Sequence, residues 1–133
     1  MVPSLSLRMG WMALALLAPL MAKADDTQSP EYKRGRLLFI QCRACHDLQP
    51  SAVDKVGPNL AGLIGRRAGQ VPEFAYSAAL SGSKMVWDLA TLDRWIEKPG
   101  AVIPGNAMAF AGMANAADRA ALIRYIEIDS APR

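Results

Sequence analysis

The stretch Cys42-Arg43-Ala44-Cys45-His46 decides how the rest of the chain can be interpreted, because it holds both cysteines and the only histidine of the 133 residues. Cysteines at positions i and i+3 lie on nearly the same face of a helical turn. The pattern Cys-x-x-Cys-His is typical of covalent haem attachment, in which each sulfur forms a thioether with a haem vinyl group. We therefore predict one haem c bound through Cys42 and Cys45, with His46 as a ligand of its iron.

Other interpretations of the two cysteines fit the sequence less well. A dithiol redox pair is expected beside a strand-helix-strand unit, and the sequence predicts none. A structural zinc ion takes about four nitrogen or sulfur ligands, whereas this chain offers three candidates. A simple disulfide would leave the adjacent His46 unexplained.

The flanks of the motif predict a helix followed by an ordered loop. Residues 31–45 are helical in pattern, although Gly35 costs such a helix about 1 kcal/mol relative to alanine. A close approach by another helix would explain this glycine. Residues 47–70 are rich in turn formers, yet they include three apolar residues that need burial, namely Leu60, Leu63 and Ile64.

The second half of the chain predicts three further helices and a second irregular loop. Residues 74–80 could form a short helix. Asp88 can cap a helix that runs to about Glu97 and ends at Pro99, and Asn115 can cap the last helix. Residues 100–112 form the loop between them. Apolar residues recur at helical spacing in the two longer helices: Leu92, Trp95 and Ile96 in one, and Leu122, Tyr125 and Ile126 in the other. With no convincing strand, the fold class is predicted to be all-α in a single domain.

Residues 1–24 have the plan of a secretory signal peptide. Arg8 supplies the positive start, residues 9–22 form an uncharged apolar run, and Ala22-Lys23-Ala24 is a cleavage signal. The run is shorter than the roughly 20 residues that span a bilayer, so no membrane span is expected in the mature form. We expect export to a bacterial periplasm and a mature domain over residues 25–133, with residues 25–30 as a loose tail.

Removal of this segment nearly neutralises the chain. The full sequence has 15 basic and 12 acidic residues, a net charge of +3. Arg8 and Lys23 leave with the signal peptide, so 13 basic and 12 acidic residues remain, a net charge of +1. No basic stripe or recognition motif supports a nucleic-acid partner.

The sixth ligand of the iron is open at this point. A second histidine is absent from the sequence, which leaves a methionine, a lysine or an open site. Methionine ligation suits electron transfer, whereas an open site suits gas binding or peroxidase chemistry. Three methionines remain after residue 24, and they are Met85, Met108 and Met113.

From residue 35 to residue 125 the sequence resembles the class I cytochromes c. Gly57-Pro58-Asn59-Leu60 and Gly62-Leu63-Ile64-Gly65-Arg66 are similar to the family's loop after the haem motif. Ile103-Pro104-Gly105-Asn106-Ala107-Met108 is similar to its methionine loop. The resemblance implies the cytochrome c fold and selects Met108 as the sixth ligand.

The same resemblance assigns supporting roles by position. The Pro58 carbonyl should accept the second ring N–H of His46. Arg66, Tyr76 and Trp87 match residues that hold a buried haem propionate. Gly35 and Phe39 on the first helix should cross the last helix at Leu122 and Tyr125.

The sequence departs from the mitochondrial type of this family around the haem. Trp95 replaces a tyrosine near the methionine sulfur, and Leu80 replaces an asparagine that orders a water molecule. Three positions where that type has lysines at the haem edge hold small residues, which are Gly100, Ala101 and Ala107.

The function predicted from these observations is one-electron transfer by an exported, monomeric protein that is not an enzyme. Its expected partners are redox proteins, such as a cytochrome bc complex, a terminal oxidase or a periplasmic dehydrogenase. Two alternatives are a haem sensor or peroxidase-like protein with a labile Met108, and an electron-entry subunit of a larger oxidoreductase.

Overall fold

The structure is a computed structural model that describes residues 26–133, so the predicted signal peptide lies outside the described residues. The described part is helical, and its only strand-like pairing is one isolated bridge between Arg67 and Val86. The all-α prediction is confirmed. In chain order the elements are η1 (Asp26–Gln28), α1 (Pro30–Leu38), α2 (Ile40–Arg43), α3 (Ala78–Ser81), α4 (Leu89–Glu97), α5 (Pro99–Val102) and α6 (Ala116–Ser130).

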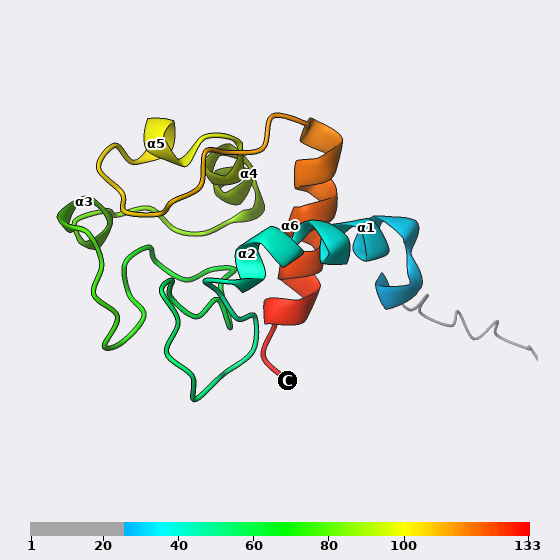
Figure 1. Cartoon of the computed structure of the whole chain (residues 1–133), viewed down its shortest axis with the longest axis horizontal. Helices are drawn as coiled ribbons and strands as arrows, with labels where there is room; N and C mark the ends of the chain where they lie inside the picture. The colour runs from blue at the N-terminus through cyan, green and yellow to red at the C-terminus, as the bar shows by residue number, and fades with distance from the viewer. Residues whose placement is uncertain (1–25) are drawn as a thin grey trace, which may run out of the picture.

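The crossing of α1 and α6 is the frame of the molecule (Figure 1). A Cβ atom at Gly35 would overlap the carbonyl of Ala121 and lie 2.7 Å from Cβ of Tyr125. Tyr125 also contacts Phe39, with ring centroids 5.5 Å apart. The predicted crossing is therefore confirmed, and close packing of the two backbones explains the glycine in α1.

The helix predicted over residues 31–45 is wrong in detail, because it is divided at Phe39. The backbone tightens there: the N–H of Cys42 donates to the carbonyl of Phe39, and the N–H of Cys45 donates to the carbonyl of Cys42. These bonds span three residues, as in a 3₁₀ turn, and the same two carbonyls also accept four-residue bonds from the N–H groups of Arg43 and His46. The two cysteines consequently lie on a tightened turn that begins at α2.

Residues 47–70 form the ordered loop that the sequence predicts, and backbone hydrogen bonds tie it to distant elements. The N–H of Gly62 donates to the Ser130 carbonyl at the end of α6, and that of Gly65 donates to the Trp87 carbonyl. Leu63 is buried, but Ile64 is 38% exposed, so the expectation of burial is wrong for Ile64. The loop nevertheless closes one side of the core.

The remaining helices follow their caps. Asp88 accepts the Thr91 N–H at 2.7 Å and begins α4, as predicted. The helix expected over residues 74–80 is shorter, because Ser77 is the N-cap and α3 begins only at Ala78. Pro99 ends α4 but also opens the short α5, since the fixed φ of proline suits the first position of a helix.

In the described residues, no helix has the length and apolar character needed to cross a membrane.

Candidate haem site

His46 lies on the turn that follows α2, and one of its ring nitrogens is already engaged. Nδ1 is 2.7 Å from the carbonyl oxygen of Pro58. A carbonyl can only accept, so Nδ1 donates its proton and Nε2 keeps a lone pair for a metal ion. Burial lowers the pKa of the imidazole from its ordinary value, against the opposing effect of the Pro58 hydrogen bond. The ring is thus neutral and oriented, as a metal ligand must be.

Cys42 and Cys45 are half-buried free thiols on the same turn. Burial, followed by the neighbouring Cys45, raises the pKa of the Cys42 thiol to about 11. A thiol with so high a pKa is a poor dithiol redox group, because the thiolate is the reactive form. Within residues 26–133 no three histidine, cysteine or acidic side chains are grouped to hold a metal ion. The geometry therefore does not favour the redox-pair or zinc interpretations.

Met108 lies in the irregular segment between α5 and α6, which is fixed on both sides. Before it, the Asn106 side chain donates to the Ile103 carbonyl at 2.8 Å and accepts the Met108 N–H at 3.0 Å. After it, the N–H of Met113 donates to the Ile96 carbonyl of α4 at 2.8 Å. Met108 itself is half-buried against the core. A thioether on a segment held at both ends can be directed at an iron atom.

Burial alone does not distinguish Met108 from the two other candidate methionines. Met85 and Met113 are also half-buried against the same core. The selection of Met108 thus rests on the loop in which it lies and on the resemblance of that loop.

Trp87 and Trp95 form a buried edge-to-face pair, with ring centroids 5.3 Å apart. Neither indole N–H has a hydrogen-bond acceptor among the described residues. Each indole nitrogen nevertheless keeps some accessible surface. Buried indole N–H groups usually find an acceptor. These two donors therefore suit a bound group that brings acceptors of its own.

The three residues expected at a haem propionate are neighbours in the structure. The N–H of Trp87 donates to the Arg66 carbonyl at 2.9 Å, and the Arg66 guanidinium interacts electrostatically with Tyr76. The Tyr76 hydroxyl accepts the Val71 N–H, which leaves its own proton free to donate. Burial raises the pKa of Tyr76 and lowers that of Arg66.

Arg66 also has a structural duty that the sequence does not reveal. Its two terminal nitrogens donate to the carbonyls of Ala61 and Asn59, at 2.7 and 2.9 Å. The guanidinium thus holds the loop over residues 59–66 in shape. Burial of a charged group is costly unless it is hydrogen-bonded, and these two carbonyls supply the bonds.

The donor set fits a c-type haem. The turn offers two free thiols and an oriented imidazole, and the loop after α5 offers a thioether. Half-buried apolar side chains from several segments pack on the buried core beside them, and they include Leu60, Leu80, Met85 and Phe110. The chain thus supplies covalent anchors, metal ligands and apolar surface together.

Sequence reasoning did not reveal the contacts of two basic residues that hold the loops around this site. Lys55 donates to the Arg43 carbonyl at 2.7 Å and forms an ion pair with Asp47 at 2.8 Å, which ties the loop back to the cysteine turn. Arg119 forms an ion pair with Asp93, and this contact, more than any other, raises the pKa of the guanidinium. Arg119 is three residues before Leu122, on the buried face of α6, and that spacing was the available signal.

Comparisons with known proteins agree with this geometry. Cytochrome c2 of Rhodomicrobium vannielii is 43% identical over 93 residues, which are 70% of this chain and 74% of that protein. Cytochrome c 2.1 of Caenorhabditis elegans is 42% identical over 108 residues, 80% of this chain and 96% of that protein. No family model matches the chain.

A solved structure is similar as well. Cytochrome cH from Methylobacterium extorquens superimposes with a TM-score of 0.68 at 33% identity, over 73% of this chain and 97% of the other. The similarity thus extends over nearly the whole of that fold.

Proposed function

Because this chain belongs to the class I cytochromes c, we propose that it is an exported one-electron carrier whose haem iron is bound by His46 and Met108. The family relationship establishes one covalent haem c and a role in electron transfer rather than in catalysis. The ligand pair, the compartment and the partners are the proposed part. The observation that carries the proposal is the 2.7 Å contact between Nδ1 of His46 and the Pro58 carbonyl, which leaves Nε2 free.

The haem supplies a one-electron couple between ferric and ferrous iron. Cys42 and Cys45 attach it to the turn after α2. His46 is fixed by Pro58, and Met108 is held between Asn106 and Met113, so neither side chain has to move when the charge of the site changes. Buried neighbours such as Phe39 and Leu63 exclude water.

Three further residues are proposed to hold a haem carboxylate. Trp87 and Tyr76 each have a proton to donate, and Arg66 brings positive charge to the same region. A buried carboxylate needs several donors, because an ionised group without them is strongly destabilised away from water.

The proposed place of action is the periplasm, reached through the signal peptide predicted over residues 1–24. There the protein would act as a monomer and pass electrons between redox proteins, such as a cytochrome bc complex, a terminal oxidase or a periplasmic dehydrogenase. No contact with nucleic acid is proposed.

Covalent attachment is tested on a denaturing gel. After expression with an intact haem-maturation system, we expect haem-dependent peroxidase staining to migrate with the polypeptide. Cys42→Ala with Cys45→Ala should lose this stain, and mass spectrometry should place the mature N-terminus near residue 25. Haem that acid and organic solvent extract from the wild-type protein would contradict the proposal.

The sixth ligand is tested by single substitutions. Met108→Ala should abolish the absorption band of sulfur bound to ferric iron and lower the reduction potential. Met113→Ala and Met85→Ala are matched controls, because these residues are half-buried in the same core, and both should keep the band. If Met113→Ala loses the band and Met108→Ala retains it, the assignment is reversed.

Carbon monoxide distinguishes the carrier from a sensor or peroxidase-like protein. A carrier with a firmly bound methionine should not bind carbon monoxide in its native reduced state. Rapid binding by the wild-type protein would instead indicate a labile sixth position.

A further inference from the structure

Arg119 is the only charged residue that is buried among residues 26–133, with 6% of its surface exposed. It lies in the first turn of α6, and its guanidinium contacts two other segments. Nε donates to the Asp93 carboxylate of α4 at 2.8 Å. Nη1 donates to the carbonyls of Met113 and Ala114, at 3.0 and 2.8 Å. One side chain thus joins α6, α4 and the end of the segment that carries Met108.

The contacts use the shape of arginine. Its planar guanidinium presents donors in several fixed directions, whereas the lysine ammonium is a compact point charge on a flexible stem. The carbonyls of Met113 and Ala114 precede the Asn115 cap, so α6 provides no backbone donor for them. Arg119 satisfies both, and its charge is compensated by Asp93 at 2.8 Å and by Glu97 at 3.6 Å.

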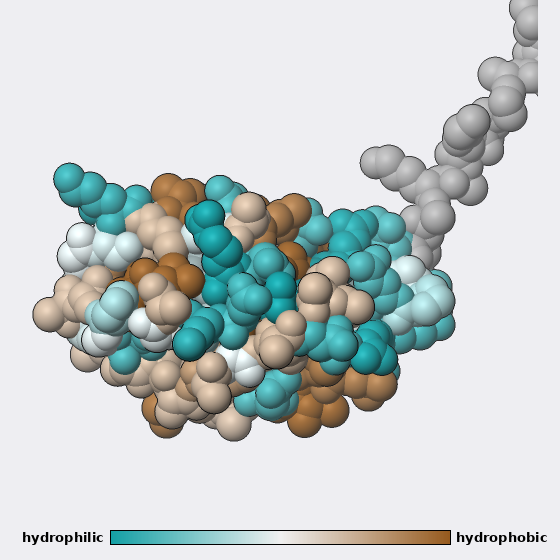
Figure 2. Space-filling view, turned by 90° about the horizontal axis from the view of Figure 1, so that it is seen from above, coloured by the Kyte–Doolittle hydropathy of each residue, from teal (hydrophilic) through white to brown (hydrophobic). Residues whose placement is uncertain are grey.

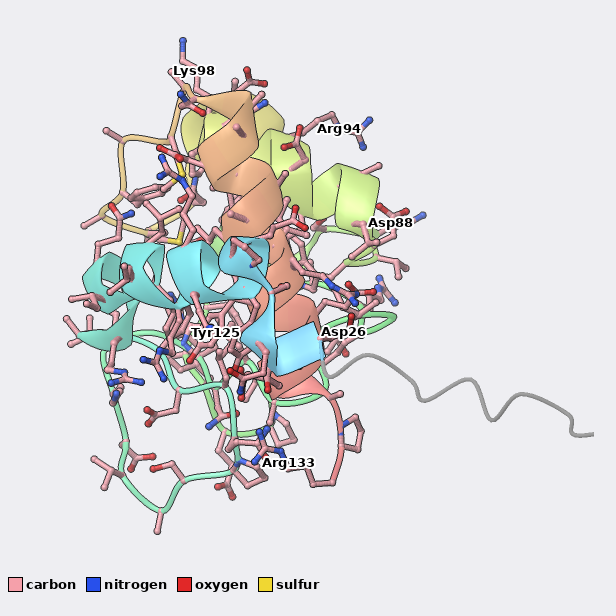
Figure 3. All side chains as sticks on the ribbon, turned by 90° about the vertical axis from the view of Figure 1, so that its right-hand side faces the viewer. Asp26, Asp88, Arg94, Lys98, Tyr125 and Arg133 are labelled. Atoms are coloured by element: carbon pink, nitrogen blue, oxygen red, sulfur yellow. The ribbon has the colours of Figure 1, made fainter. Side chains whose placement is uncertain are left out.

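Other basic residues nearby do not form these contacts. Arg94 lies in α4 and Lys98 directly follows that helix, and both side chains point away from the body of the molecule (Figure 3). Neither forms an ion pair in the described part of the chain. The ion pair of Asp93 is therefore made by Arg119 rather than by a neighbour on its own helix.

Two further contacts hold the same end of the loop against α4. The N–H of Met113 donates to the Ile96 carbonyl at 2.8 Å. A Cβ atom at Gly112 would overlap the carbonyl of Glu97, so the backbone there lies directly on the last turn of α4. Residues 112–114 are consequently fixed to α4, four to six residues after Met108.

We propose that Arg119 is a positioning residue for the sixth ligand: by joining the Met113 and Ala114 carbonyls to α4, it keeps Met108 directed at the iron. This inference rests on the proposed ligation by Met108. Arg119 lies in α6, outside the haem-binding loops. It would nevertheless control how readily the methionine leaves the iron.

The test compares two variants that divide the contacts of Arg119. Arg119→Lys keeps a positive charge beside Asp93 and Glu97 but cannot reach all three acceptors. Asp93→Asn removes the ion pair with Asp93, leaves the longer one with Glu97 at 3.6 Å, and keeps both bonds to the carbonyls. Each holoprotein is titrated with urea while the sulfur-to-iron band and the far-ultraviolet helix signal are followed. In Arg119→Lys the band should be lost at a lower urea concentration than the helix signal, and the gap between the two midpoints should be wider than in wild type. In Asp93→Asn this gap between the midpoints should equal that of wild type.

Carbon monoxide gives a second readout. Hydrogen bonds from a charged donor are strong enough that their loss should raise the carbon monoxide affinity of reduced Arg119→Lys by about tenfold or more. Arg34→Gln is the control, because it removes the Arg34–Asp118 ion pair at the same end of α6 without touching the loop. Equal shifts of the band and the helix signal in Arg119→Lys, or a wider gap between the midpoints in Asp93→Asn, would overturn the proposal.

Hydrogen exchange of the wild-type holoprotein tests, without any variant, the premise that residues 112–114 are fixed to α4. The Met113 amide, bonded to Ile96, should be protected as strongly as the Arg119 amide, bonded to Asn115, and more strongly than the Phe110 amide. Exchange of Met113 together with Phe110 would refute the role of Arg119. It would leave ligation by Met108 intact, because Met108→Ala tests that ligation separately.

Discussion

At the scale of single residues, the space around His46 is set by a glycine. A Cβ atom at Gly57 would lie 2.5 Å from Cε1 of His46 and 2.8 Å from the Cys45 carbonyl. The N–H of Gly57 also donates to that carbonyl at 3.0 Å, so the backbone cannot retreat without losing the bond. The imidazole cannot turn away either, because Pro58 holds its other side.

Gly57→Ala should therefore destabilise the holoprotein by about 1–3 kcal/mol, the usual cost of overpacking. It should also weaken the contact between His46 and Pro58 and lower the yield of attached haem. Gly100→Ala is the matched control, because a Cβ atom there meets nothing within 4 Å, and it should be neutral or slightly stabilising. Urea denaturation and haem quantification measure both effects, and equal stability of the two variants would contradict the argument.

The role of a residue can be predicted from sequence where the residues that act together are adjacent in the chain. Cys42, Cys45 and His46 are adjacent, so the motif alone indicates their use. Met108 could not be found in this way, because Met113 is similarly half-buried only five residues later. The contacts of Arg119 depend on α4 and α6 packing together, which no local pattern encodes.

At the scale of elements, the crossing of α1 and α6 extends from Gly35 to a hydrogen bond near the end of α6. The Tyr32 hydroxyl donates to the Asp129 carboxylate at 2.5 Å, and its ring packs edge-on against Tyr125, with centroids 5.2 Å apart. Burial and this carboxylate raise the pKa of Tyr32 to about 12. Tyr125 lies in α6 where α1 passes it (Figure 3).

Tyr32→Phe should destabilise the protein by about 1 kcal/mol at neutral pH, through loss of one hydrogen bond. The folded state holds the Tyr32 proton more tightly than the unfolded state, whose pKa is near 10. The advantage of wild type over Tyr32→Phe is thus complete below pH 10 and should shrink as the pH rises towards 12. Urea denaturation from pH 8 to 11.5 measures it, and a constant difference would disprove the linkage.

Element types could be predicted from sequence more reliably than element ends. Asp88 and Asn115 cap α4 and α6 as predicted, because a cap is a local contact between a side chain and the next turn. The division of the first helix at Phe39 and the late start of α3 could not be predicted. Both depend on hydrogen bonds between residues that are close in sequence, and several turn geometries fit the sequences at Phe39 and Ser77 equally well.

At the scale of the whole molecule, several charges of both signs are compensated locally by ion pairs. Lys55 is paired with Asp47, Arg34 with Asp118, and Arg124 with Asp26. The face seen from above alternates hydrophilic and hydrophobic residues instead of presenting one continuous patch of either kind (Figure 2). If residues 1–24 are removed as proposed, two basic residues leave with them, and the pI of about 9.1 overstates the basic character of the remaining chain.

The surface that leads into the cysteine turn is notably apolar. Leu37 in α1 is 64% exposed and Ile40 at the start of α2 is 63% exposed. Val56 is 85% exposed beside Gly57, whose N–H donates to the Cys45 carbonyl. Three small residues replace the lysines that the mitochondrial type of the family has at the haem edge, and they are Gly100, Ala101 and Ala107. Contact with a redox partner should then depend on apolar surface more than on charge.

Electron transfer to a native redox partner should consequently depend weakly on salt. A patch of one charge accelerates association, and salt screens it over a Debye length of about 8 Å at physiological ionic strength. Lys55, which is tied to the cysteine turn, is already neutralised by its ion pair with Asp47. The measurement is the rate of oxidation by membranes that contain the native redox partner, from low to physiological ionic strength. Gly100→Lys with Ala101→Lys restores two charges and should introduce a steep salt dependence where the wild type has little. A steep fall in the wild-type rate would instead reveal a charged docking patch.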